Sequence, residues 1–182
     1  LLDVDHSKIL LNAALETGLP VWVGLSCCDS KFDNSVIGRN FRAEKEKSLI
    51  YDENKYRDQP KYLPEDKIIL LEDIIKSLTS LGGDVYGIMH TWFQDSIGGL
   101  KILKNNWKGP IMFYPEIHKF DTNTHKAIIT MTEEEFSNSI LELIDDQIQI
   151  VGGCCGVNDK HLKRLIQSIS EKINQYSKFF KI

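Results

Sequence analysis

IQIVGGCCG, residues 148–156, is a short apolar run rich in β-branched residues that passes directly into glycines and a cysteine pair. Earlier runs of the same apolar character occupy residues 21–25, 84–90 and 110–115. Short, continuous apolar runs are typical of strands that are buried on both faces, as in a parallel sheet. The four runs therefore predict four parallel strands.

Amphipathic stretches separate these predicted strands and have the spacing of helices. The predicted helices cover 7–17, 68–81, 95 or 96 to about 105, 132–145, and 158 or 159 to about 173. This alternation predicts an α/β fold with a parallel sheet covered by helices. An open doubly wound sheet and a (β/α)₈ barrel share the pattern. Because a complete barrel needs roughly 250 residues, a chain of 182 would supply only about half of one.

The composition is that of an ordinary globular protein, with 42% hydrophobic residues, 26% charged residues and a net charge of −4. The acidic balance does not favour nucleic-acid binding. No apolar run approaches the roughly 20 residues of a membrane helix, and without a signal-peptide pattern we expect a cytoplasmic protein with reduced thiols. The polar segment 28–67 interrupts the alternation, and the start at Leu1 favours a piece of a longer chain.

Residues able to carry chemistry follow the predicted strands, at the edge where a parallel fold gathers its functional groups. His90 follows the second strand, Glu116 and His118 the third, and Cys154 and Cys155 the fourth. Cysteine and histidine at separate strand ends are the parts of a zinc site. Equally, Gly-Gly-Cys-Cys-Gly can be a turn holding two small buried thiols, because free cysteine is among the most buried residue types.

The other cysteines and histidines are assigned simpler roles. Cys27 and Cys28 follow the first strand, and we interpret them as structural thiols rather than as further metal ligands. His125 and His161 are predicted to lie at the surface.

In several segments the sequence resembles the homocysteine S-methyltransferase family. The matching segments are 151–156 with 159–162, 17–23, 113–115 and 131–136. Their order and spacing agree with the family from about residue 15 to 165, apart from an insertion at about 30–65. The resemblance implies a single domain over 1–182 that corresponds to the second half, strands five to eight, of a (β/α)₈ TIM barrel.

The resemblance also implies a zinc site that departs from the family pattern. The family binds zinc through three cysteines, two of which carry over to Cys154 and Cys155. The third closes an Asn-Cys-Ser motif, which here reads Met89-His90-Thr91. His90 is a competent replacement ligand, because a Cys₂His set is a known catalytic arrangement. Two thiolates and a neutral imidazole would leave the site at zero charge instead of −1. We expect this less electron-rich zinc to hold a substrate thiolate more tightly and to leave it less nucleophilic.

The implied activity is zinc-dependent transfer of a methyl group from a donor to the thiol of homocysteine or a related small molecule, as in methionine biosynthesis. We expect Glu116, Trp92, Tyr114 and Gly153 to line the substrate site, and a carboxylate at 116 would suit a cationic donor. Two alternatives stay open: a divergent zinc-binding barrel with a different reaction, and a non-catalytic half-barrel partner module. Since a half-barrel leaves sheet edges open, we expect either a homo-oligomer or a missing N-terminal half-barrel.

Overall fold

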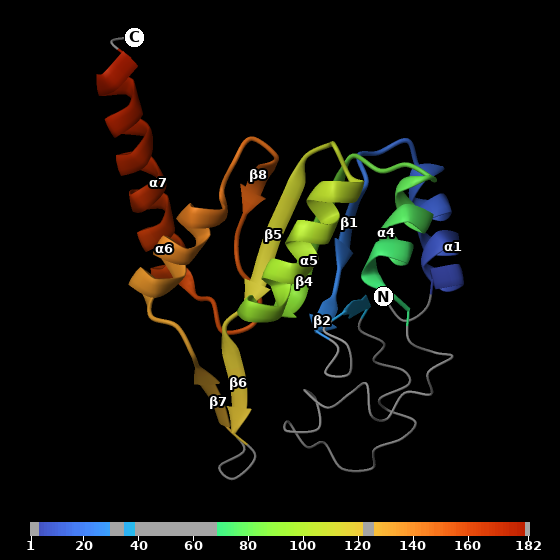
Figure 1. Cartoon of the computed structure of the whole chain (residues 1–182), viewed down its shortest axis with the longest axis horizontal. Coiled ribbons are helices and arrows are strands. Elements are labelled where there is room, and N and C mark those ends of the chain that lie inside the picture. Colours follow the sequence, from blue (N-terminus) through green and yellow to red (C-terminus); the bar gives the residue numbers. More distant parts are fainter. Residues whose placement is uncertain (1–3, 30–34, 39–68, 122–125, 181–182) are drawn as a thin grey trace.

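The computed structural model describes residues 4–29, 35–38, 69–121 and 126–180 (Figure 1). Most of the predicted insertion at about 30–65 therefore lies outside the described residues, as does His125. No helix among the described residues is long and apolar enough to cross a bilayer.

The centre of the fold is a parallel sheet of four strands. It contains β1 (Trp22–Leu25), β4 (Val85–Trp92), β5 (Ile111–Glu116) and β8 (Ile148–Val151). The spatial order β1-β4-β5-β8 follows the order along the chain, and all three pairs are parallel. The α/β class and the parallel sheet are thereby confirmed. A sheet in which each strand lies beside its predecessor is compatible with part of a (β/α)₈ barrel, whereas the order reverses in a doubly wound sheet.

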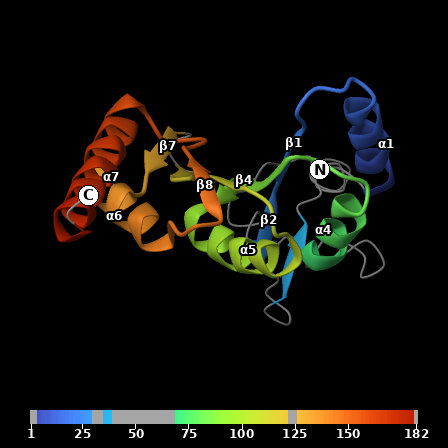
Figure 2. The same ribbon diagram turned by 90° about the horizontal axis from the view of Figure 1, so that it is seen from above.

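Helices precede, connect and follow these strands. They are α1 (Val4–Leu15), α4 (Leu71–Thr79), α5 (Phe93–Asn106), α6 (Glu133–Leu143) and α7 (Asp159–Phe180). Viewed from above, α4 and α5 lie on the same side of the sheet, while α6 and α7 lie side by side next to β8 (Figure 2). The five predicted helices are confirmed, with ends that differ by a few residues.

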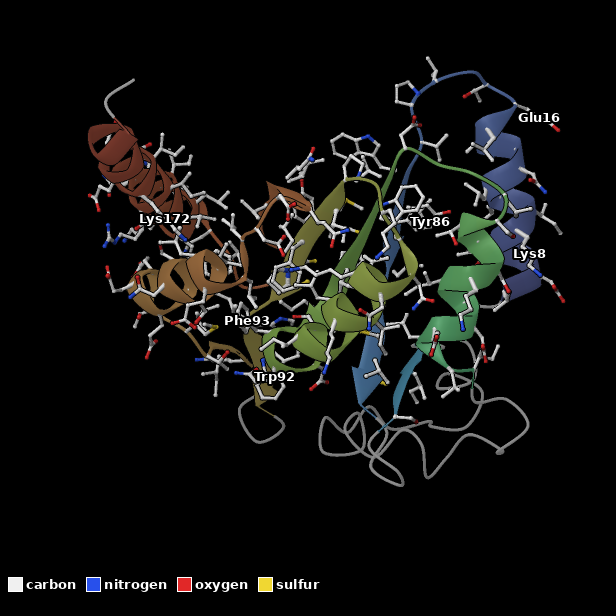
Figure 3. The ribbon with its side chains drawn as sticks, turned by 45° about the horizontal axis from the view of Figure 1, so that its top comes forward. Lys8, Glu16, Tyr86, Trp92, Phe93 and Lys172 are labelled. Carbon is white, nitrogen blue, oxygen red and sulfur yellow. The ribbon has the colours of Figure 1, made fainter. Side chains whose placement is uncertain are left out.

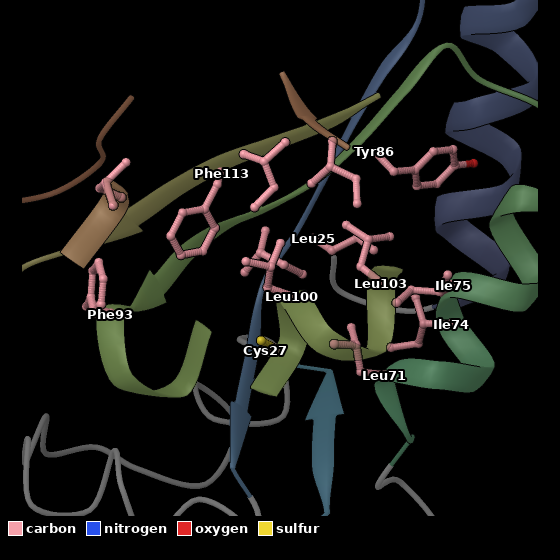
Figure 4. Packing of buried hydrophobic residues seen from close by; sticks show 14 of the residues in the cluster. Leu25, Cys27, Leu71, Ile74, Ile75, Tyr86, Phe93, Leu100, Leu103 and Phe113 are labelled. Atoms are coloured by element: carbon pink, nitrogen blue, oxygen red, sulfur yellow. The ribbon is translucent and has the colours of Figure 1, made fainter. Parts of the chain in front are cut away.

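The two faces of the sheet are filled in different ways. Alternate residues, among them Tyr86, Ile88 and Phe113, point into a core closed by α4 and α5, and all three are fully buried (Figure 4). On the other face, the Met89 and Met112 side chains lie close to glycines of the neighbouring strands, Gly24 and Gly87 respectively. Because Gly24 and Gly87 have no side chain, they leave space for the methionine side chains of the adjacent strands.

Two antiparallel hairpins extend past the carboxyl ends of the main strands (Figure 1). One pairs β2 (Cys27–Asp29) with β3 (Val36–Gly38), and the other pairs β6 (His118–Asp121) with β7 (Lys126–Ile129). The sequence predicted neither hairpin. The second one leaves β5 at the edge where the candidate ligands gather.

The helix beginnings show which sequence signals are reliable. Asn158 caps α7, since its side-chain oxygen accepts the backbone N–H groups of Lys160 and His161. The predicted start of the earlier helix at Asp95 or Ser96 is wrong, because α5 begins at Phe93 directly after β4. The hydroxyl of Ser96 is buried and donates to the carbonyl of Phe93 at 2.6 Å, within the helix.

The start of α6 provides a stability test. Thr132 and Glu135 form a complete capping box, in which each side chain accepts the backbone N–H of the other residue. The hydrogen bonds from Thr132 also hold the pKa of Glu135 below its usual value. We expect Thr132→Ala to lower the free energy of unfolding by about 1 kcal/mol in urea titrations. Ser170→Ala, which removes an exposed mid-helix hydroxyl, is the control and should be neutral; equal losses would contradict the capping role.

Candidate metal centre

Four potential metal ligands meet at the carboxyl edge of the sheet. His90 comes from β4, Glu116 from the end of β5, and Cys154 and Cys155 from the segment after β8. One ligand atom from each residue lies within 4.8 Å of all the others. The Cys154 Sγ atom is 3.1 Å from His90 Nδ1 and 3.9 Å from Cys155 Sγ. Glu116 Oε1 is 3.8 Å from His90 Nδ1.

A bulge in β4 gives His90 its place in this group. In the pairing of β4 with β5, Met89 lies opposite Tyr114 and Trp92 opposite Glu116, so β4 has one residue more than β5. His90 lies within that bulge with a φ of 51°, and it is the one described residue other than glycine with a positive φ. Such a φ is uncommon for a side chain of this size. Bulges re-aim side chains next to functional sites, and here the imidazole faces a cysteine sulfur.

Backbone hydrogen bonds attach the cysteine segment to β5. The N–H of Gly152 donates to the carbonyl of Phe113, and the N–H of Cys154 donates to the carbonyl of Pro115. In the other direction, the N–H of Ile117 donates to the carbonyl of Cys155 at 2.9 Å. The two cysteines are therefore fixed relative to Glu116 by main-chain contacts.

This geometry requires glycine at two positions, Gly152 before the cysteine pair and Gly156 after it. A Cβ atom on Gly152 would lie 2.7 Å from the ring of Tyr114. Gly156 has a φ of 90°, and a Cβ atom there would lie 3.0 Å from the backbone nitrogen of His118. Glycine permits both the close approach and the backbone turn.

The electrostatics of the group favour a bound cation. Burial, together with the neighbouring Cys154 and Glu116, raises the pKa of the Cys155 thiol to about 11. The side chain of Glu116 is only 14% exposed. Three acidic groups thus share a small volume, and a cation between them would favour their ionised forms.

The separation of the two cysteine sulfurs also fits a zinc ion. Two sulfur ligands at about 2.3 Å from a tetrahedral zinc lie about 3.8 Å apart, and the two cysteine sulfurs are 3.9 Å apart. Cysteine, histidine and carboxylate ligands are the set that zinc takes in proteins. His90, Glu116, Cys154 and Cys155 are therefore able to hold a metal ion.

The predicted substrate residues surround this group to different degrees. Trp92 ends β4 opposite Glu116 and is partly buried, at the end of the strand remote from Tyr86 (Figure 3). Tyr114 packs on Gly152, and the side chain of Val157 covers Gly153. The structure places the carboxylate of Glu116 among the candidate ligand atoms.

The remaining cysteines lie apart from the ligand group. Cys27 is buried and its thiol faces the carbonyl of Asp95 at 3.9 Å, which confirms its structural interpretation. Cys28 is half-buried in β2.

The prediction that His161 lies at the surface is wrong. Its side chain is 3% exposed, bonds to Asn158 and Met131, and packs edge-on against Phe136. It lies one helical turn before the buried Leu165, on the face of α7 that packs against the rest of the fold.

Comparison with known proteins identifies the chain. Residues 70–169, more than half of the 182, match the family model for homocysteine S-methyltransferase. No curated protein matches the chain. The matched segment begins just before α4 and includes all four members of the ligand group. This chain belongs to the homocysteine S-methyltransferase family.

Proposed function

We propose that the chain binds zinc through Cys154, Cys155, His90 and Glu116 and transfers a methyl group to the thiol of homocysteine or a related small molecule. The observation that carries this proposal is the convergence of the four ligand atoms within 4.8 Å in a chain of this family. A bound zinc ion would lower the pKa of a substrate thiol and so supply a nucleophilic thiolate at neutral pH.

Each protein group has a defined part in this site. As thiolates, Cys154 and Cys155 contribute two negative charges, which balance the two positive charges of the zinc ion. His90 is a neutral ligand. Glu116 is the fourth ligand, and its carboxylate brings the site to −1, the charge that three thiolates would give. Zinc favours sulfur over carboxylate oxygen, so Glu116 would be the ligand that gives way to a substrate thiol.

The neighbouring residues complete the substrate site in this proposal. Trp92 and Tyr114 line it beside Glu116, and Gly153 lines it next to the cysteines. The net negative charge suits a cationic methyl donor, a sulfonium or quaternary ammonium compound. The four parallel strands correspond to strands five to eight of a (β/α)₈ barrel whose remaining strands belong to another segment or another copy.

The position of Glu116 also supports a second candidate function. Zinc sites with four protein ligands are typically structural, whereas catalytic sites keep an open position. If the carboxylate stays bound, the centre stabilises a barrel with a different activity or none. The two functions differ in whether a substrate thiol can replace Glu116 as a zinc ligand.

A methyl-transfer assay tests the proposed activity. The full-length protein, purified under reducing conditions, is incubated with homocysteine and either S-methylmethionine or betaine, and methionine is measured by mass spectrometry. We expect methionine with at least one donor, loss of activity after zinc is removed with a chelator, and recovery when zinc is returned. Zinc-bound protein that forms no product with any thiol would favour the structural site. Zinc-free protein would overturn both candidates.

A further inference from the structure

The backbone carbonyl of Met89, directly before His90, accepts hydrogen bonds from two side-chain hydroxyls. Ser26 Oγ donates to it at 3.1 Å and Thr91 Oγ1 at 3.0 Å. Thr91 is fully buried and Ser26 is 8% exposed. Two buried hydroxyls on one carbonyl are a specific arrangement, because each of them loses its hydrogen bonds to water on burial.

This carbonyl lies where the regular pairing of β4 is interrupted. The pairing of β4 with β1 extends to Leu25 opposite Ile88, and the pairing with β5 is irregular between Met89 and Trp92. A buried carbonyl needs a hydrogen-bond donor. At the bulge, side-chain hydroxyls supply donors that a regular ladder would otherwise provide.

Thr91 also connects the bulge to the next hairpin. Its hydroxyl accepts the backbone N–H of Cys27 at 3.0 Å while it donates to Met89. The hydroxyl therefore acts as both a donor and an acceptor. Together the two hydrogen bonds connect Met89 and Thr91, the residues before and after His90, to Cys27 at the beginning of β2. Valine has the same shape as threonine and can form neither bond.

We propose that Ser26 and Thr91 are positioning residues that hold His90 in its left-handed conformation and so direct its imidazole toward the cysteine sulfur. A left-handed backbone at a residue other than glycine persists only where its surroundings impose it. The two hydroxyls fix the peptide that begins this turn. The inference rests on the proposed metal centre and adds to it the residues on which the histidine ligand depends.

The test measures zinc affinity rather than activity alone. Full-length wild-type protein, Thr91→Val, Thr91→Ser and Ser26→Ala are titrated with zinc against a chromophoric chelator, each also in a His90→Ala background. We expect Thr91→Val to weaken zinc binding about tenfold, as outer-shell substitutions do, and Thr91→Ser to restore most of it. In the His90→Ala background, Thr91→Val should have no further effect, because there is no imidazole to position.

Cobalt substitution and a control variant separate positioning from folding. We expect Thr91→Val and His90→Ala to change the visible ligand-field bands of the Co²⁺ protein in the same way, while the sulfur charge-transfer bands remain. Thr79→Val is the matched control, because its hydroxyl bonds within α4, and it should leave zinc affinity unchanged. If Thr91→Val does not fold, Ser26→Ala supplies the test, with a smaller expected loss of about threefold.

Three results would overturn the proposal, and they distinguish failure of the positioning role from failure of the metal centre. Equal losses of zinc affinity from Thr91→Val in the wild-type and His90→Ala backgrounds, or no loss from the folded hydroxyl variants, would overturn the positioning role alone. Wild-type protein with no affinity for zinc would overturn the metal centre and the positioning role together.

Discussion

Replacing Cys154 or Cys155 with serine should reduce bound zinc from about one ion per chain to roughly a tenth of that. The serine hydroxyl does not ionise near neutral pH and lacks the soft sulfur that zinc prefers. Each substitution leaves the zinc ion with one sulfur ligand in place of two. Metal analysis after desalting, combined with the methyl-transfer assay, measures both consequences.

The matched control for this loss is Cys28→Ser. Cys28 is a half-buried cysteine in β2 and lies outside the ligand group. We expect this variant to retain zinc and activity. Full zinc content in both Cys154→Ser and Cys155→Ser, or the same loss in Cys28→Ser, would contradict the assignment of the ligands.

Gly87→Ala should destabilise the protein by about 3 kcal/mol, the upper end of the usual cost of overpacking. Gly87 lies in the middle of β4, opposite Met112 of β5. An added Cβ atom would overlap both the side chain and the backbone carbonyl of Met112. A carbonyl in a strand cannot move without separating β4 from β5, and these two strands carry His90 and Glu116. Urea unfolding of the full-length protein measures the change.

Gly24→Ala provides the comparison for this prediction. Gly24 lies beside Gly87 on the neighbouring strand, but its added Cβ atom would overlap the side chain of Met89 and contact that of Met112, without meeting backbone atoms among its nearest neighbours. Methionine is flexible and can move aside, so we expect a loss of about 1 kcal/mol. Equal losses at the two glycines would show that the backbone contact is not the dominant cost.

Local sequence patterns predicted the main sheet and the five helices. Each predicted strand is a short apolar run, a pattern that depends only on burial on both faces, and all four lie in the sheet. The box formed by Thr132 and Glu135 could be predicted because its partners are three residues apart. The start of α5 could not, because Ser96 bonds within the helix instead of capping it.

Three members of the candidate ligand group were predicted from the sequence, but its geometry was not. Strand ends indicated His90, Cys154 and Cys155 as ligands, since parallel strands gather their carboxyl ends at one edge. The bulge at His90 depends on hydroxyls of Ser26 and Thr91 that meet only in the folded chain. For the same reason the sequence did not indicate that the carboxylate of Glu116 lies among the candidate ligand atoms.

X-ray absorption at the zinc edge of the full-length protein, purified under reducing conditions, tests the metal centre most directly. The four-ligand site predicts zinc with two sulfur and two nitrogen or oxygen neighbours, and a Cys154→Ser variant with the sulfur contribution lost or halved. Protein free of zinc, or zinc surrounded by three or four sulfur atoms, would contradict a centre built from Cys154, Cys155, His90 and Glu116.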